Sequence, residues 1–410
     1  MDIQINEKRF LETLHQLWNT AKKQNECGLN ILPGTKENKA VLDLLVSWMK
    51  AENLKVQIDD VGNVYGIRSG IQKDRKPLAI GSHVDTVVNG GKYDGILGVI
   101  GGLEVIRCLN ENHIATEQDL VLCIWANEEG ARFLPGMAGS SVVMGNAETQ
   151  VLLSNCDQKT KETYHEAMQQ IGYIGKKENR LTSMEKYLEL HIEQGPILEE
   201  RGFSVGIVAG VKAMAWNQIV VKGESNHAGP CPMHLRKDAL LAATHMINDI
   251  EQIAVENTKS NTTVTFGHME VLPDEITIIP KQVTFTQDMR SEDGNVVKTG
   301  QQRVKEIVQR VAERYHVSAD IQPIGEMPET KFDADIMKDI ESAMKHRGEE
   351  ISYLYSGAGH DAFQIAQHFP VGMIFVRTKN GKSHVPEEYA EDNDIIKETQ
   401  ILLDTVLLRV

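Results

Sequence analysis

The chain has 410 residues, of which 41% are hydrophobic and 25% charged. This composition predicts a folded protein of two domains and excludes a disordered one. Its 43 basic and 58 acidic residues leave a net charge of −15, which argues against nucleic-acid and anionic-membrane partners. Five scattered cysteines without a C-x-x-C pair, and a polar amino terminus without a signal peptide's apolar run, predict a cytoplasmic protein. The most apolar stretch, residues 96–106, is too short to span a membrane.

The first half of the chain alternates helical and strand-like patterns. Apolar periodicity predicts helices over residues 7–23, 40–52 and about 95–110, and a strand and turn over 55–65. Four short apolar runs have the pattern of buried strands. They are residues 77–82, 120–126, 187–192 and 371–376. Buried strands separated by helices predict an α/β fold, a mostly parallel sheet with helices on both faces and its chemistry at the carboxyl ends of the strands.

Residues 211–327 have a different pattern, in the order β-α-β-β-α-β. The expected strands are 217–221, 262–271, 276–288 and 319–324, and the expected helices are 237–254 and 300–315. This is the ferredoxin-like order. We therefore expect a catalytic domain built from residues 1–210 and 328–410, with residues 211–327 inserted as a separate domain.

Polar residues follow each of the four buried strands. His83 and Asp94 follow the first, and the pair Glu128-Glu129 follows the second. Taken singly, each has an ordinary alternative, because a histidine at a strand end is often structural, Asp94 could cap a helix and Glu128-Glu129 could be a solvated loop. His191 and His384, however, occur at the other two strand ends. Convergence of these side chains on one edge predicts a pair of divalent cations bridged by a carboxylate.

Six segments together resemble one family of enzymes. They are GSHVDTVVNGGKYDG, ANEEGARF, ELHIEQG, GESNHAG, SGAGHDA and GKSHVPEE, and they run in family order from about residue 80 onward. The resemblance is to the amidase, hydantoinase/carbamoylase family of di-metal hydrolases, which includes N-carbamoyl-L-amino-acid hydrolases, β-ureidopropionases and allantoate amidohydrolases. It implies a homodimer whose inserted domain acts as lid and dimerisation domain, and whose motif histidine reaches the neighbouring subunit's metals.

The resemblance also assigns metal ligands. His83 and His191 would bind one ion, Glu129 and His384 the other, and Asp94 would bridge the two. Histidine and carboxylate ligands suit zinc, manganese, cobalt or nickel alike, so the metal stays open.

Further roles follow in the catalytic domain. Asp85 would hold the His83 ring with its carboxylate, and Glu128 would be the general base that moves a proton from water to the leaving nitrogen. Adjacent residues at a strand end point in different directions, which agrees with a ligand at Glu129 and a base at Glu128. Gln194 resembles the family's substrate-binding glutamine.

In the inserted domain, His227 matches the histidine that binds the developing oxyanion, and Arg290 matches the arginine that binds the substrate carboxylate. Without the resemblance, His227 would be an ordinary surface residue and Arg290 half of an ion pair with Asp288. In the catalytic domain, Gly357 and Gly359 form either a backbone cradle for substrate or a plain turn.

The substrate is less well defined than the chemistry. Thr277 stands where family members commonly have a substrate-contacting asparagine, Met214-Ala215 replaces a more polar wall, and Cys231 replaces a threonine, whereas Trp216 agrees with the carbamoylases. We expect an N-carbamoyl-L-amino acid or related ureide with a free carboxylate. The alternatives are allantoate, a dipeptide or N-acyl amino acid, and a catalytically dead binding protein on this scaffold.

Overall fold

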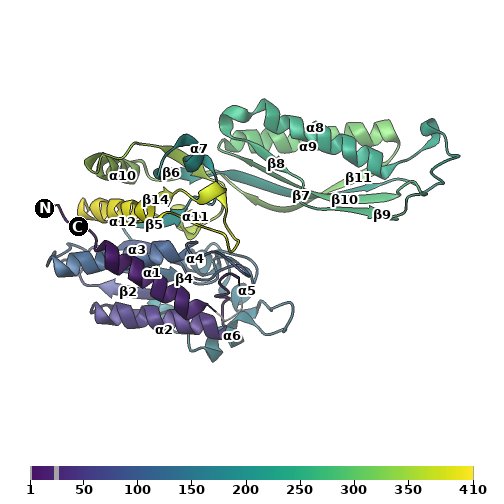
Figure 1. Cartoon of the computed structure of the whole chain (residues 1–410). Helices are drawn as coiled ribbons and strands as arrows, with labels where there is room; N and C mark the ends of the chain where they lie inside the picture. Colours follow the sequence, from purple (N-terminus) through teal and green to yellow (C-terminus); the bar gives the residue numbers. More distant parts are fainter. Residues whose placement is uncertain (1, 23–26, 410) are drawn as a thin grey trace. The chain divides into compact units, whose positions relative to one another are not determined.

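The computed structural model describes residues 2–22 and 27–409. The chain divides into two compact units (Figure 1). The first joins the residues up to Gly210 to those from Lys331 onward, and the second is Val211–Thr330. No helix in the described ranges is long and apolar enough to cross a membrane.

A nine-stranded sheet forms the centre of the first unit. The strand order is β1-β2-β4-β3-β5-β14-β6-β12, with β13 beside β6. The strands are β1 (Lys55–Ile58), β2 (Val64–Arg68), β3 (Leu78–His83), β4 (Leu120–Trp125), β5 (Lys186–Ile192), β6 (Val205–Val211), β12 (Thr330–Lys331), β13 (Tyr353–Ser356) and β14 (Val371–Val376).

The four predicted buried strands are adjacent and mutually parallel in this sheet. They are β4, β3, β5 and β14, in which His83 pairs with Trp125 and Phe375 pairs with His191. Strands β1, β2 and β6 flank them in antiparallel pairs. The predicted parallel-rich α/β fold is confirmed, and the antiparallel strands form its margins.

Helices cover both faces of the sheet. They are α1 (Glu7–Ala21), α2 (Lys36–Ala51), α3 (Ile96–Glu111), α4 (Ala138–Met144), α5 (Thr149–Ser154), α6 (Tyr164–Gln170), α7 (Ile197–Arg201), α10 (Ala334–His346), α11 (Asp361–Ala366) and α12 (Asp392–Leu407). In β5, Leu190 packs against α3, whereas the neighbouring Glu189 accepts a hydrogen bond from the backbone N–H of Ala362 in α11. Because successive strand residues point to opposite faces, α3 and α11 lie on opposite sides of the sheet.

Two helix boundaries of the first unit differ by more than one residue from the sequence-based expectation. The second helix begins at Lys36 rather than at residue 40, because the Thr35 side chain accepts a hydrogen bond from the Asn38 N–H and caps it. The first helix ends at Ala21, and the expected end at residue 23 lies outside the described residues.

The second unit is an antiparallel sheet with two long helices. The order β11-β7-β10-β8, with β9 also on β10, is the ferredoxin-like one. The elements are β7 (Ala213–Lys222), α8 (Ala239–Glu256), β8 (Thr263–Thr265), β9 (Met269–Leu272), β10 (Gln282–Ser291), α9 (Gly294–Tyr315) and β11 (Ser318–Met327). Alternate residues of β10 face the core. Among them, Val283, Phe285 and Met289 pack in one apolar cluster with residues of α8 and α9.

Strands β7 and β11 and helix α9 extend beyond their predicted bounds, and α9 begins at Gly294 rather than at residue 300. Two other predicted strands of this unit are wrong in their extent. The strand expected over 262–271 is two short pieces, β8 and β9, and the strand expected from 276 begins only at Gln282. Residues 273–281 are instead a loop, in which Ile276 is 97% exposed. Pro273 and Pro280 explain the loop, because neither can donate a backbone hydrogen bond to a sheet.

Candidate active site

The carboxyl ends of the four parallel strands carry most of the predicted site residues. His83 ends β3, Glu128 and Glu129 follow β4, His191 lies near the end of β5, and His384 follows β14. Because neighbouring parallel strands end at the same edge, the topology brings these four segments together. Asp94 reaches the same place from the loop that precedes α3.

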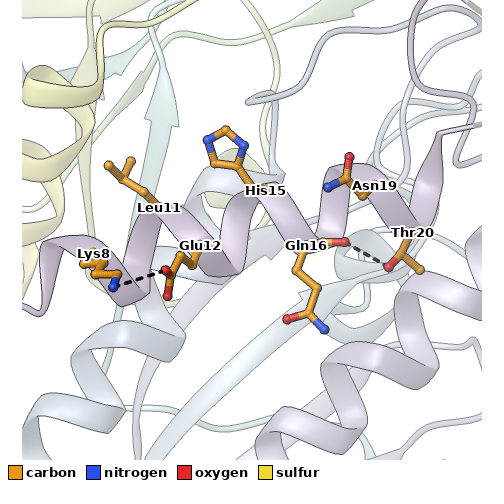
Figure 2. A pocket seen from close by; sticks show the side chains of 7 residues that line it. All are labelled: Lys8, Leu11, Glu12, His15, Gln16, Asn19 and Thr20. Atoms are coloured by element: carbon orange, nitrogen blue, oxygen red, sulfur yellow. Dashed lines mark hydrogen bonds and ion pairs between the residues drawn. The ribbon is translucent and has the colours of Figure 1, made fainter.

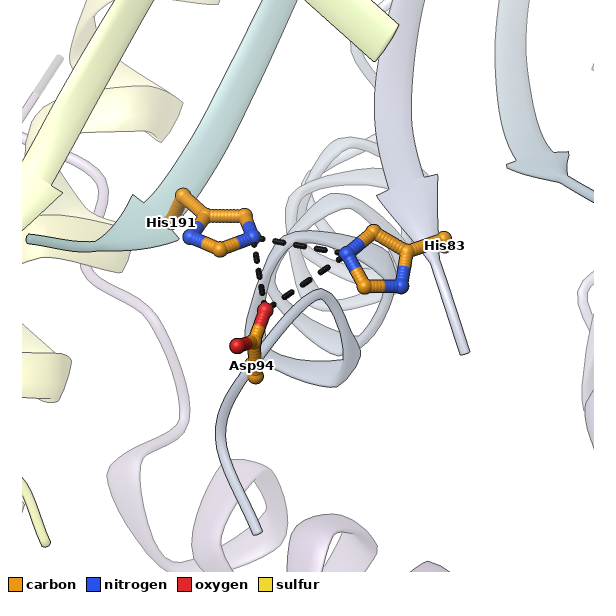
Figure 3. Close-up of side chains that lie close together, drawn as sticks. All are labelled: His83, Asp94 and His191. Atoms are coloured by element: carbon orange, nitrogen blue, oxygen red, sulfur yellow. Dashed lines mark hydrogen bonds and ion pairs between the residues drawn. The ribbon is translucent and has the colours of Figure 1, made fainter. Parts of the chain in front are cut away.

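His83, Asp94 and His191 form the first cluster (Figure 3). The Asp94 Oδ1 atom lies 3.1 Å from His191 Nε2 and 3.6 Å from His83 Nε2, and the two imidazole nitrogens are 3.5 Å apart. All three side chains are buried. The other ring nitrogens are held by backbone carbonyls, His83 Nδ1 at 3.0 Å from the Asp85 oxygen and His191 Nδ1 at 2.9 Å from the Ile192 oxygen. Both Nε2 atoms therefore face the centre of the cluster.

Gly95 is required for this cluster. It has a φ of 66°, and a Cβ atom at this position would lie 2.4 Å from the His83 ring. A side chain here would collide with the imidazole, and the left-handed backbone favours glycine.

Asp94, Glu129 and His384 form the second cluster. His384 Nε2 lies 3.2 Å from Asp94 Oδ2 and 3.3 Å from Glu129 Oε2. The two oxygens of Asp94 thus face different clusters, Oδ1 the first and Oδ2 the second. Two histidine-carboxylate groups that share one carboxylate are a donor set suited to two divalent ions.

The charges around Asp94 set its ionisation. Burial alone would raise the pKa of Asp94, but His191, His384 and His83 outweigh burial and hold the pKa well below its usual range. Asp94 is therefore ionised, which favours the binding of cations. For Glu129, burial and the nearby Asp94 raise the pKa to about 7.

Glu128 lies beside the first cluster. Its Oε2 atom is 3.6 Å from His83 Nε2, and burial raises its pKa well above the ordinary value. The Asp85 carboxylate accepts hydrogen bonds from the backbone N–H groups of Glu128 and Glu129, at 3.2 and 3.1 Å. Asp85 contacts His83 Nδ1 through its backbone carbonyl oxygen, at 3.0 Å, rather than through the carboxylate as expected, which lies 3.9 Å from Nδ1. Asp85 therefore orients both glutamates as well as the histidine.

Gln194 lies at the second cluster. Its Nε2 atom donates to Asp94 Oδ2 at 2.7 Å and is 3.3 Å from His384 Nε2. Gly357 and Gly359 lie in the turn between β13 and α11, where a Cβ atom at Gly357 would meet nothing within 4 Å.

Two polar groups next to the clusters were missed as site residues. His360 packs edge-on against His191, with ring centroids 4.4 Å apart, and Glu189, His191 and His360 form a third group that could hold a cation. Glu388 is buried and accepts hydrogen bonds from the Tyr93 and Asp94 backbone N–H groups. His360 lies within the motif SGAGHDA and Glu388 within GKSHVPEE, and membership of these motifs was the signal that could have identified them.

The second unit holds the remaining predicted residues. His227 is exposed, and the loop 273–281 folds onto its segment, where Ala228 N–H donates to the Thr277 carbonyl at 2.9 Å. Arg290 in β10 donates to the Asp288 carboxylate, with 2.7 Å between Nη2 and Oδ2, and lies over the Trp216 ring at 5.8 Å. The structure therefore places Thr277 beside the His227 segment, and Arg290 beside Trp216.

A separate hollow of about 570 Å³ lies on the surface of α1 (Figure 2). It is lined by Lys8, Leu11, Glu12, His15, Gln16, Asn19 and Thr20. All seven residues come from one helix, so the hollow lacks an opposing wall, and none is a predicted site residue.

Comparison with known proteins agrees with this geometry. Residues 79–408 match the model of peptidase family M20/M25/M40. The chain is 34% identical over 407 residues to the N-carbamoyl-L-amino acid amidohydrolase of Geobacillus stearothermophilus, covering 98% of each chain. The chain belongs to peptidase family M20/M25/M40. The crystal structure of an amidase of the hydantoinase/carbamoylase family from Burkholderia multivorans is similar to this chain, with a TM-score of 0.95, 35% identity and coverage of 100% of this chain and 99% of that one.

A more distant relative is allantoate deiminase 1 of Glycine max, 29% identical over 86% of this chain and 80% of the relative. The suspected family is thus confirmed. The protein is a metal-dependent hydrolase of C–N bonds other than peptide bonds.

Proposed function

We propose that this protein is a two-metal N-carbamoyl-L-amino-acid amidohydrolase. The observation that carries the proposal is the placement of Asp94, whose two carboxylate oxygens each face one histidine-containing cluster. His83 and His191 would hold one ion, Glu129 and His384 the other, and Asp94 would bridge them. Ions bound there would activate a water molecule and polarise the ureido carbonyl group. Zinc, manganese, cobalt and nickel all suit these ligands.

Glu128 is the proposed general base. It is buried beside the first cluster and is not a member of either proposed ligand set. Its carboxylate takes a proton from the attacking water and gives it to the leaving nitrogen when the terminal C–N bond of the ureido group breaks. With water, the N-carbamoyl amino acid then gives the free amino acid, carbon dioxide and ammonia. The Asp85 carboxylate keeps Glu128 in place by accepting a hydrogen bond from the Glu128 backbone N–H.

Substrate recognition is assigned to residues of both units. Arg290 pairs with the substrate carboxylate, because a guanidinium matches a carboxylate in two parallel hydrogen bonds. His227 donates to the oxyanion that develops on the ureido carbon, and Gln194 and the Gly357–Gly359 turn bind the rest of the substrate. Thr277 stands where the family commonly has a substrate-contacting asparagine. Its hydroxyl has one donor hydrogen where the amide has two, so it offers fewer hydrogen bonds to the second ureido group of allantoate.

The proposed assembly is a cytoplasmic homodimer in which His227 serves the partner's metal site. All the candidate metal ligands lie in the first unit, whereas His227 is exposed in the second. Strand β11 supports pairing between copies, because among the described strands it pairs only with β7, which leaves a ten-residue edge.

Ammonia release from a substrate panel tests the activity, and free amino acids are measured for the dipeptides, whose hydrolysis releases no ammonia. The full-length protein, stripped of metal and reloaded with each divalent ion in turn, is given N-carbamoyl-L-amino acids, allantoate, ureidoglycolate and dipeptides. We expect the highest kcat/KM with an N-carbamoyl-L-amino acid, and a kcat at least about 100-fold lower in the Glu128→Gln control. A higher value for allantoate would move the protein to the deiminase branch, and no turnover of any substrate despite bound metal would indicate a binding protein.

A further inference from the structure

Glu388 is a buried carboxylate that the proposed mechanism does not use. It follows His384 by four residues, and only 3% of it is exposed. Its Oε1 atom accepts hydrogen bonds from the backbone N–H groups of Tyr93, at 2.9 Å, and of Asp94, at 3.2 Å. Its Oε2 atom lies 3.0 Å from the Ser383 hydroxyl. One side chain therefore ties the segment before α3 to the loop after β14.

Ser383 extends this connection to the second cluster. Its Oγ atom lies 3.0 Å from Asp94 Oδ2, the same oxygen that faces His384 at 3.2 Å. Asp94 and His384 come from segments that are far apart in the chain. Glu388 and Ser383 link the two segments next to both residues, so they set the distance between Asp94 and His384.

His384 needs such an anchor more than the other proposed ligands. It lies in a loop with a φ of 59°, and 47% of its side chain is exposed. The side chains of His83 and His191 are only 1% exposed, they belong to strands, and their second ring nitrogens are held by backbone carbonyls. The first cluster is therefore fixed by the sheet, whereas the second depends on a loop.

Gly91 leaves room for the carboxylate. A Cβ atom at Gly91 would lie 2.1 Å from both the Cδ and Oε1 atoms of Glu388. Any side chain at this position must displace the Glu388 carboxylate from its hydrogen bonds. Gly91→Ala is therefore a way to move Glu388 without changing its chemistry.

We propose that Glu388 is a positioning residue for the second metal position, formed by Asp94, Glu129 and His384. This inference rests on the proposed two-metal function. Removing the Glu388 carboxylate releases the Tyr93–Asp94 backbone and the Ser383–His384 loop from each other. The second ion is then bound more weakly, while the first ion keeps its two strand-borne histidines.

Metal titration of the full-length, metal-free protein tests this role. Zinc binding is followed by calorimetry, and the variant His384→Ala identifies which binding step belongs to the second position. We expect Glu388→Ala to lower the affinity of that step by about 10- to 100-fold and to leave the other step close to wild type. Gly91→Ala should have the same selective effect. Glu387→Gln, at the exposed neighbouring glutamate, is the matched control and should bind both ions normally.

The conservative variant separates hydrogen bonding from charge. In Glu388→Gln, the amide oxygen can accept from the Tyr93 and Asp94 N–H groups, and the amide nitrogen can donate to Ser383. We expect Glu388→Gln to bind the ion at the second position with nearly wild-type affinity. A loss equal to that in Glu388→Ala would overturn positioning by hydrogen bonds.

The remaining outcomes distinguish this role from the proposed function. Wild-type protein that binds one zinc ion would overturn the two-metal function and this role with it. Wild-type protein that binds two ions, with both kept at normal affinity in Glu388→Ala, would overturn only the role of Glu388. If Glu388→Ala lost both steps, Gly91→Ala decides, because a selective loss there supports the role and any other result overturns it.

Discussion

Glu128 and Glu129 are neighbours at the end of β4, but their side chains have different surroundings. Glu129 Oε2 lies 3.3 Å from His384, whereas Glu128 Oε2 lies 3.6 Å from His83 outside both proposed ligand sets. We predict that Glu128→Gln keeps two ions per chain and lowers kcat at least about 100-fold, because an amide cannot take up the proton from water. Glu129→Gln should lose affinity for one ion. Steady-state kinetics and elemental analysis measure the two effects, and near-normal turnover of Glu128→Gln would show that the base is another group.

Arg290 holds an ion pair with Asp288 that a substrate carboxylate would have to share. Removing a charged hydrogen bond costs about 1.5 to 3 kcal/mol, or roughly 10- to 150-fold in affinity. We predict that Arg290→Ala raises KM by this factor for N-carbamoyl amino acids but little for the matching amides, which lack the carboxylate. Arg310→Ala is the control, because Arg310 forms an exposed pair with Asp249 in the same unit. Equal losses on both substrates would assign Arg290 a structural role.

The residues at the strand ends were the easiest to predict from the sequence. His83 and His191 lie in or at the end of short apolar runs, where a buried strand must deliver the next polar side chain to the sheet edge. Glu388 could not be predicted in this way, because its contacts are with the backbone of Tyr93 and Asp94, nearly 300 residues earlier. The hydrogen bonds that the Asp85 carboxylate accepts from two backbone N–H groups were also not predictable, because they depend on the local path of the chain, which a motif does not specify.

Whole elements were predictable where the apolar pattern was strong and local. The four central strands match the predicted runs closely, because each is buried on both faces. Their order in the sheet and the antiparallel direction of β6 depend on tertiary pairing, which an apolar run does not encode. In the second unit, the loop over 273–281 replaced part of a predicted strand because its two prolines interrupt the pattern.

The core of the second unit offers a stability test at the scale of one strand. Phe285 is fully buried in β10 and packs in the cluster with α8 and α9, whereas the next residue back, Thr284, is only partly buried on the other face. We predict that Phe285→Ala lowers the free energy of unfolding by about 3 to 5 kcal/mol, because it removes a large buried side chain and leaves a cavity. Thr284→Ala should cost far less. Urea denaturation of the full-length protein, followed by circular dichroism, compares the two midpoints, and equal midpoints would contradict the assigned core face.

At the scale of the whole molecule, the proposed metal ligands and two proposed substrate-binding residues belong to different units. The proposed ligands His83, Asp94, Glu129, His191 and His384 belong to the first unit, and His227 and Arg290 belong to the second. The proposed mechanism therefore needs residues of both units, and it allows those of the second unit to come from the same chain or from the partner in a dimer. The two arrangements differ in a way that mixed dimers can measure.

A hybrid dimer of Glu128→Gln with His227→Ala decides between them. If His227 serves the partner's site, the hybrid has one site with both lesions and one site with neither, so activity returns. Random mixing gives about half hybrids with one good site in two, so the mixture should recover up to roughly a quarter of wild-type activity. If His227 serves its own chain, every site in the hybrid carries a lesion and nothing returns. Subunit exchange is checked by mass spectrometry of the intact dimers, and full exchange without recovery would leave His227 acting in its own chain or as a surface residue.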